Sequence, residues 1–281
     1  MPSAAARAAM LKTRVLTAIV LIALVLTALT LLPTAWLGAA VGMVVLLAAW
    51  EWTALCGVRD RGLRIVYLIV LAAAGVSLVA LPALPVLLAG VAWWSWEGWR
   101  VWRRRAQSTP IKDSSLFMQW RGLFILLPAW YAILYLHQQD PRSPLVIVCL
   151  FVLVWLADSG AYLAGSLFGK TKLAPGVSPG KTLEGALGGL IAVAVAALAS
   201  GMFVWRMSAE TLALWLAVAL VAALFSVLGD LVESQAKRAA GVKDSGRLLP
   251  GHGGVLDRID AFSAAAPPFA LGWILFVGGK P

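Results

Sequence analysis

Long apolar stretches recur along the whole 281-residue chain and constrain its fold more than any other feature. A bilayer core of about 30 Å takes roughly 20 apolar residues per helical crossing. Hydrophobic residues make up 61% of the chain and charged residues 13%, whereas about a quarter of a soluble domain is charged. We therefore predict an all-α polytopic membrane protein with about nine transmembrane helices. The predicted stretches are residues 15–33, 36–57, 65–81, 83–99, 119–137, 144–165, 185–205, 211–232 and 255–277.

The positive charges of the chain gather on one side of these predicted crossings. Lysine and arginine are retained in cytoplasmic loops. With a cytoplasmic N-terminus, all 23 lysine and arginine residues except Arg142, Arg206 and Lys280 fall on the cytoplasmic side. A helix lost or gained would move every later loop to the other side. The charges therefore favour nine crossings, with the C-terminus outside.

The net charge of +10 indicates an acidic partner. The basic residues are spread over separate loops beside apolar segments rather than gathered on one soluble face. Anionic membrane lipids are therefore the predicted partner, and no nucleic acid is expected.

The polar content of the apolar stretches divides the chain into two regions. Residues 1–115 carry the first four predicted helices and basic cytoplasmic loops, with few polar residues inside the helices. Residues 116–281 carry the fifth to ninth helices and form the predicted catalytic region, in which polar residues become dense after about residue 145. Glu51 and Glu97 lie near the cytoplasmic ends of the second and fourth helices. We predict that both pair with neighbouring arginines and have no further function.

Asp158 lies inside the sixth predicted helix, within the sequence "VWLADSGAYLAGSLFGKTKL". An ionised carboxylate at that depth costs several kcal/mol unless it is paired or faces water. Ser159, Tyr162 and Ser166 lie within helical reach of it. This pattern favours a polar cavity over a buried structural hydrogen bond.

The loop that follows, "GKTKLAPGVSPGKTLEG", resembles a phosphate-binding P-loop without matching one. That motif needs glycine five residues before the Gly-Lys-Thr, and the two candidates have Pro175 and Ala164 there. We predict a Gly/Pro-rich cytoplasmic loop that enters a helix, whose main-chain donors suit phosphate oxygens. Lysines that merely mark the cytoplasmic side are the alternative. The candidate substrate-binding residues here are Ser178, Lys181, Thr182 and Glu184.

The end of the eighth predicted helix carries acidic, hydroxyl and basic side chains on one face. Asp230, Glu233, Ser234 and Lys237 recur at i, i+3, i+4 and i+7. Asp257 and Asp260 share the first turn of the ninth helix in the same way. Carboxylates open to phosphate oxygens predict a Mg²⁺ site, and the chain has no histidine and cysteine cluster for zinc.

The segment between the eighth and ninth predicted helices contains several glycines and one histidine, His252. The glycines around His252 allow close main-chain approach. His252 is predicted to be a hydrogen-bonding brace, with a role as general acid or base as the alternative.

Residues 234–260 resemble the signature of the phosphatidate cytidylyltransferases, the CDP-diacylglycerol synthases. One departure is Ala236, where that family usually has a larger aliphatic residue or Phe, and this affects packing rather than chemistry. The resemblance extends weakly back through "SPGKTLEG" and "ADSGAY" and covers residues 150–262. The matching residues are Ser234, Lys237, Arg238, Lys243, Asp244, Gly246, Leu249, Pro250, His252, Gly253, Gly254, Asp257, Arg258, Ile259 and Asp260.

The resemblance implies that CTP and phosphatidate react to give CDP-diacylglycerol and pyrophosphate. It implies that Asp230 and Asp257 hold Mg²⁺, and it suggests a homodimer. A second, monovalent cation such as K⁺ is left open. The active site would face the cytoplasm of a bacterial-type cytoplasmic (inner) membrane.

The site residues divide by predicted role. Lys237, Arg238 and Arg258 are expected to bind phosphates beside the metal and count as catalytic with Asp230 and Asp257. Asp244 and Asp260 are expected to support the metal or orient the basic residues. The full predicted substrate-binding set is Asp158, Ser178, Lys181, Thr182, Glu184, Ser234, Lys243, Asp244, His252, Gly253, Gly254 and Asp260.

Two other classes of protein are compatible with intramembrane charges. A CTP-dependent polyprenol kinase would use a related site on a lipid alcohol, and it would need a base such as His252 or Asp244. A transporter would place its charges nearer the bilayer midplane, often in broken helices of paired repeats. Here the charges gather at one edge and no repeat is evident, so the transporter is the weaker alternative.

Overall fold

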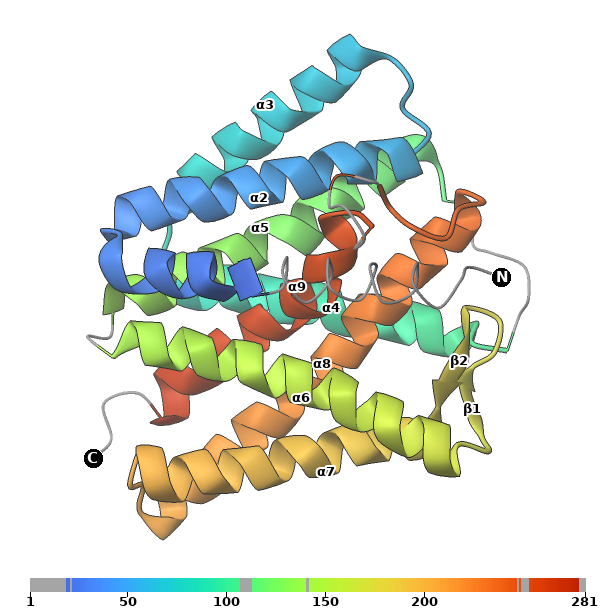
Figure 1. The fold of residues 1–281 in the computed structure, drawn as a ribbon. Helices are drawn as coiled ribbons and strands as arrows, with labels where there is room; N and C mark the ends of the chain where they lie inside the picture. Colours follow the sequence, from blue (N-terminus) through green and yellow to red (C-terminus); the bar gives the residue numbers. More distant parts are fainter. Residues whose placement is uncertain are drawn as a thin grey trace.

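A computed structural model describes residues 19–20, 22–106, 113–139, 142–246, 248 and 253–277. Within them the chain is a bundle of helices with one small hairpin (Figure 1). A short helix at Ile22–Leu31 comes first. The others are α2 Thr34–Leu55, α3 Arg61–Leu78, α4 Ala83–Arg103, α5 Ser115–Gln139, α6 Ser143–Phe168, α7 Leu183–Ala199, α8 Ala209–Ala239 and α9 Leu256–Gly272.

A helix occupies each of the predicted apolar stretches, as far as the described residues reach. Seven of these helices are long and apolar enough to cross a membrane. The two outside that group are the short first helix and α4, which carries Glu97, Arg100 and Arg103. The chain is thus built as an all-α polytopic membrane protein. Nine crossings and the sides on which the termini lie stay predictions.

Local sequence signals set several helix boundaries. Asp60 caps α3 by accepting a hydrogen bond from the Leu63 main-chain N–H at 2.8 Å. Ser208 caps α8 in the same way through the Thr211 N–H at 3.3 Å. Pro82 directly precedes α4, where its missing donor costs nothing. α7 and α9 each end in a π-helical turn, Ser200–Val204 and Trp273–Val277.

Glycines allow two close helix contacts that position the polar edge. α6 and α7 meet at Gly160 and Gly188, where an added Cβ would run into the facing helix. α8 meets α9 at Gly229, which packs against the main chain of Asp260 and the Ala264 methyl. These contacts bring the polar ends of α8 and α9 together.

The loop predicted between α6 and α7 is a two-stranded antiparallel hairpin. Its strands are β1 Lys172–Ala174 and β2 Ser178–Thr182, and the register pairs Ala174 with Ser178. In Figure 1 the hairpin lies at the right-hand end of α6 and α7. The Gly176 N–H in its turn donates to the Arg105 carbonyl after α4 at 3.0 Å. The predicted Gly/Pro-rich connection between these helices is therefore present, and it is folded as a hairpin.

A buried ion network joins α4 to the start of α5. Arg121 donates to both carboxylate oxygens of Glu97, at 2.7 and 2.9 Å. Asp113 bridges Arg121 and Arg100, at 3.1 and 2.7 Å. The predicted pairing of Glu97 with arginine is confirmed.

The same prediction for Glu51 is not met among the residues that the structure describes. Its carboxylate accepts hydrogen bonds from the main-chain N–H groups of Val255 and Leu256 and from the Ser245 hydroxyl. The physical reason is that α2 packs against the beginning of α9, where N–H groups have no intrahelical partner.

Replacing Arg121 with alanine is expected to destabilise the protein by about 3 to 5 kcal/mol, because Glu97, with 0% exposure, keeps a buried charge without its main partner. Thermal unfolding in detergent measures the change. Arg104→Ala, at an exposed residue that ends α4, is the control and is expected to leave the unfolding temperature nearly unchanged. Equal unfolding temperatures for the two variants would contradict the expectation.

Candidate active site

The first part of the site is a cavity between α6, β2, α7 and α8. Its volume is about 400 Å³, and Asp158, Lys181, Thr182 and Asp230 contribute to its wall. The Lys181 ammonium contacts the Asp230 carboxylate at 2.6 Å. Asp158 is exposed in this cavity rather than paired inside the bundle. The predicted polar cavity around Asp158 is therefore present.

The second part of the site is the Asp257 side chain at the start of α9, whose carboxylate is held by several donors. Asp257 accepts hydrogen bonds from the main-chain N–H groups of Ser245 at 3.0 Å and Gly254 at 2.9 Å. Its other oxygen contacts the Lys237 ammonium at 2.6 Å. Gly253 adopts φ of +84°, a conformation that favours glycine. This turn aims the next N–H, that of Gly254, at Asp257.

α8 links the two parts because Asp230 and Lys237 share one of its faces. Their Cα atoms are about 10 Å apart along the helix, but the Lys237 ammonium lies back beside Glu233, one turn from Asp230, so the Asp257 pair is a neighbour of the cavity on the same face. Between them Ser234 donates to Asp230 at 3.2 Å. Glu233 is buried and lies 3.5 Å from the Lys237 ammonium. The predicted polar face of α8 thus takes part in two carboxylate–ammonium pairs. The partner of Asp230 comes from β2, and the partner of Lys237 comes from α9.

Two of the residues predicted to bind substrate, Thr182 and Glu184, use their side chains to hydrogen bond the main chain. The Thr182 hydroxyl caps α7 by accepting from the Gly185 N–H at 3.1 Å. Glu184 accepts the main-chain N–H groups of Lys170 and Thr171, both at 3.1 Å, and so closes the base of the hairpin. Ser178 begins β2, and it is not among the cavity residues.

The remaining predicted residues lie at the solvent edge or outside the description. Arg238 is exposed and donates to the Val242 carbonyl at 3.3 Å beyond the end of α8. Lys243, Asp244 and Arg258 are exposed around the same edge. Asp260 turns its carboxylate to the Ala261 N–H at 2.8 Å beside the α8 contact. His252 lies outside the described residues.

Sequence reasoning missed Glu51 as part of this region. It lies almost 200 residues before Ser245, to which it is hydrogen bonded. The signal available in the sequence was a single carboxylate in the apolar, tryptophan-containing stretch "LLAAWEWTAL". Pairing Glu51 with arginine was the simplest interpretation. In the structure its carboxylate instead accepts hydrogen bonds from the main-chain N–H groups of Val255 and Leu256.

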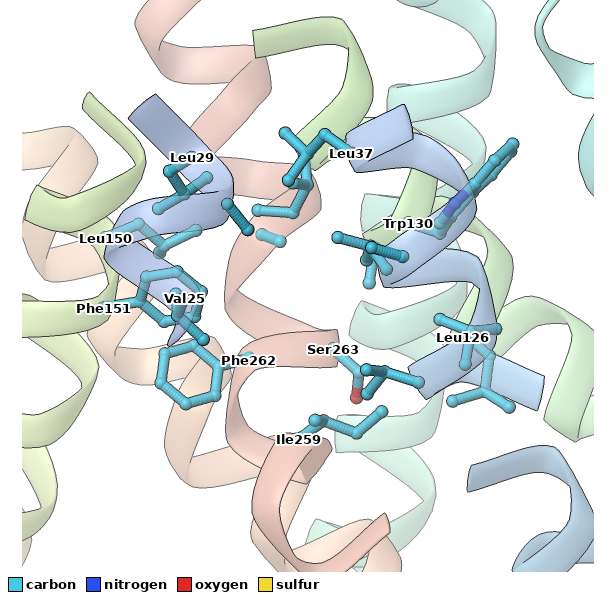
Figure 2. Close-up of a pocket in the computed structure, with 18 of the residues that line it drawn as sticks. Val25, Leu29, Leu37, Leu126, Trp130, Leu150, Phe151, Ile259, Phe262 and Ser263 are labelled. Carbon is cyan, nitrogen blue, oxygen red and sulfur yellow. The ribbon is translucent and has the colours of Figure 1, made fainter. Parts of the chain in front are cut away.

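A second, apolar cavity of about 250 Å³ borders α9 but is separate from this site. Figure 2 shows Ile259, Phe262 and Ser263 of α9 at its wall, together with Val25 and Leu29 of the first helix. These α9 residues follow helical spacing on the face opposite Asp260 and Ala264, which pack on α8. The cavity therefore lies behind the acidic face.

The donor chemistry of the site fits Mg²⁺. That ion is usually bound by one or two carboxylates, with water and substrate phosphates as the other ligands. Asp230 and Asp257 supply carboxylates from two helices, and each already has a cation, the ammonium of a lysine, at 2.6 Å. No group of three or more acidic, histidine or cysteine side chains in the described parts of the chain could hold a metal. Substrate phosphates would have to complete the coordination.

The fold and the site define a class: an integral membrane protein with paired carboxylates and lysines at one edge of a helical bundle. Residues 12–276 match the model of the cytidylyltransferase family. The chain therefore belongs to the cytidylyltransferase family and is a nucleotidyltransferase, as the resemblance in residues 234–260 implied.

Named relatives agree with this assignment. A phosphatidate cytidylyltransferase of Pseudomonas aeruginosa is 45% identical over 265 residues, covering 93% of this chain and 96% of the relative. One of Haemophilus influenzae is 40% identical over 291 residues, covering 93% and 98%. One of Staphylococcus saprophyticus is 47% identical over 136 residues, covering 48% and 51%. The first two similarities extend well beyond the signature.

Proposed function

We propose that this protein transfers the cytidylyl group of CTP to phosphatidate, giving CDP-diacylglycerol and pyrophosphate for phospholipid synthesis. The observation that carries the proposal is the pair of carboxylate–lysine contacts, Asp230 with Lys181 and Asp257 with Lys237, on one edge of a membrane-embedded cytidylyltransferase. A lipid substrate and a water-soluble nucleotide can meet at such an edge.

The proposed reaction does not require a general base. A phosphate monoester has its second pKa at about 6, so phosphatidate is largely ionised at neutral pH. Its phosphate oxygen attacks the α-phosphorus of CTP, a new P–O bond forms, and the bond to the β-phosphate breaks. Pyrophosphate leaves with the electron pair. The protein has to position the groups and neutralise charge.

The basic residues of the site suit that task. Lys181 lies in the cavity wall, and Lys237 lies two turns from Asp230 on α8. In our proposal both ammonium groups contact phosphate oxygens when the substrates bind, and their contacts with the aspartates become weaker. Arg238 and Arg258, exposed at the same edge, neutralise the attacking lipid phosphate and the leaving pyrophosphate. Asp244 and Asp260 orient these basic groups.

Asp230 and Asp257 would hold Mg²⁺, which when bound supplies charge neutralisation on the triphosphate. The two main-chain N–H groups on Asp257 fix its carboxylate in place. The positive charges of the cytoplasmic loops and the location of CTP in the cytosol support a site that faces the cytoplasm of a bacterial inner membrane. A homodimer and a second, monovalent cation are further expectations from the resemblance.

Purified protein in detergent, given CTP, Mg²⁺ and an equal mixture of phosphatidate and a polyprenol, tests the choice of lipid. We expect CDP-diacylglycerol as the only lipid product, and no product in a parallel sample containing EDTA. Phosphorylated polyprenol in place of the liponucleotide would contradict the proposal and favour a lipid kinase. Product formation that persists in EDTA would contradict the metal requirement.

A further inference from the structure

Glu51 is a buried acid that the proposed reaction does not use. It lies near the end of the apolar helix α2, and its exposure is 3%. One carboxylate oxygen accepts the Val255 N–H at 3.1 Å. The other accepts the Leu256 N–H at 2.9 Å and the Ser245 hydroxyl at 2.9 Å.

The same short segments hold Asp257 from their other side. Ser245 gives its hydroxyl to Glu51 and its main-chain N–H to Asp257. Gly254 gives its N–H to Asp257, and the next two N–H groups, of Val255 and Leu256, go to Glu51. Consecutive main-chain donors are therefore divided between the two carboxylates. The position of Asp257 is tied to that of Glu51 through covalent neighbours.

Two glycines of the signature also depend on Glu51. A Cβ at Gly246 or at Gly254 would overlap the Glu51 carboxylate. Neither residue has a positive φ, so conformational freedom does not explain them. The space that they leave is occupied by this acid, which comes from outside the signature.

Burial makes these contacts hard to replace. Val255 and Leu256 are 6% and 1% exposed, so water cannot easily take the place of a lost acceptor. The negative charge also lies at the N-terminal end of α9, where the helix dipole favours an anion. An apolar or neutral residue at position 51 would leave donors at the site without an equivalent partner.

We propose that Glu51 is a positioning residue for nucleotidyl transfer: it fixes the two segments whose main-chain amides hold Asp257. This inference rests on the proposed function of Asp257. It gives the first region of the chain, which lies outside the signature of residues 234–260, an indirect part in the reaction.

Glu51→Gln tests the inference, with Glu97→Gln as a matched control. Both substitutions neutralise a buried glutamate, but the ion pairs of Glu97 within the described ranges are with Arg121 and Arg100, outside the site. We expect Glu51→Gln to lower kcat by about 10- to 100-fold, the size expected when one charge-assisted hydrogen bond is lost. The Mg²⁺ concentration for half-maximal rate should rise, while KM for phosphatidate changes less than about twofold.

Hydrogen exchange provides a measurement that does not depend on activity. We expect faster exchange of the amides in residues 253–258 in Glu51→Gln and wild-type exchange there in Glu97→Gln. The control is expected to lose thermal stability while keeping the wild-type Mg²⁺ dependence. If Glu51→Gln does not yield folded protein, Ser245→Ala replaces it, and the same shifts are expected at smaller size.

The outcomes separate this inference from the proposed function. Wild-type kcat and Mg²⁺ dependence in folded Glu51→Gln would overturn the role of Glu51 and leave the reaction intact. The same Mg²⁺ shift in Glu97→Gln would reduce Glu51 to a general stabilising residue and also overturn it. A folded wild-type protein that makes no CDP-diacylglycerol would contradict the proposed function itself, and the exchange measurement would still report on the contacts of Glu51.

Discussion

Asp257→Asn is expected to lower cytidylyl transfer by at least about 10³-fold while leaving the protein folded. Asparagine has the shape of aspartate, and its carbonyl oxygen can still accept the Ser245 and Gly254 N–H groups. It lacks the negative charge that Lys237 contacts at 2.6 Å and that a divalent cation requires. The rate of liponucleotide formation from CTP and phosphatidate at saturating Mg²⁺ measures the loss.

Asp60→Asn is the matched control for this variant. Asp60 caps α3 in an exposed position, and asparagine caps a helix about as well as aspartate does. It should retain wild-type activity and the wild-type unfolding temperature. An Asp257→Asn protein that kept more than a tenth of the wild-type rate would show that this carboxylate does not bind the metal.

Lys237→Met is expected to lower the rate by roughly 10²- to 10³-fold, the size seen when one charge-stabilising group is removed from an active site. The lysine side chain is 13% exposed and lies between Asp257 and Glu233, at 2.6 and 3.5 Å. Methionine keeps the volume of the side chain but leaves both carboxylates without this cation. We also expect a lower unfolding temperature, because the charge of Asp257, whose side chain is 8% exposed, loses its cation.

Lys172→Met in β1 controls for the loss of a lysine near the site. Its side chain is exposed and lies outside the cavity wall, so both rate and stability should match the wild type. Rates for Lys237→Met within tenfold of this control would mean that Lys237 is structural only. In that case Lys181, in the cavity, would become the main candidate for phosphate binding.

The positions of the helices could be predicted because each apolar stretch has the length of a crossing. The acidic face of α8 could be predicted for a similar reason, since Asp230, Ser234 and Lys237 follow helical spacing. The partners of that face could not. The contacts of Asp230 with Lys181 and of Lys237 with Asp257 depend on how β2 and α9 lie against α8, and the α9 contact is set by Gly229.

Two features that the sequence did not reveal, the hairpin and the partners of Glu51, were missed for identifiable physical reasons. The hairpin could not be predicted because its strands have only three and five residues, and β2 contains a proline and a glycine. Glu51 was assigned to an arginine because its real partners are main-chain amides almost 200 residues away. Main-chain donors leave no residue-specific signal in a sequence.

The central claim is that the α-phosphate of CTP, and not its γ-phosphate, passes to the lipid. Parallel reactions with CTP labelled at the α- or at the γ-phosphorus, in the presence of phosphatidate and Mg²⁺, test it directly. We predict that the α-label enters the lipid fraction and that the γ-label appears in water as pyrophosphate, in equal amounts. A γ-label in the lipid fraction, or an α-label that stays entirely in water, would contradict the claim.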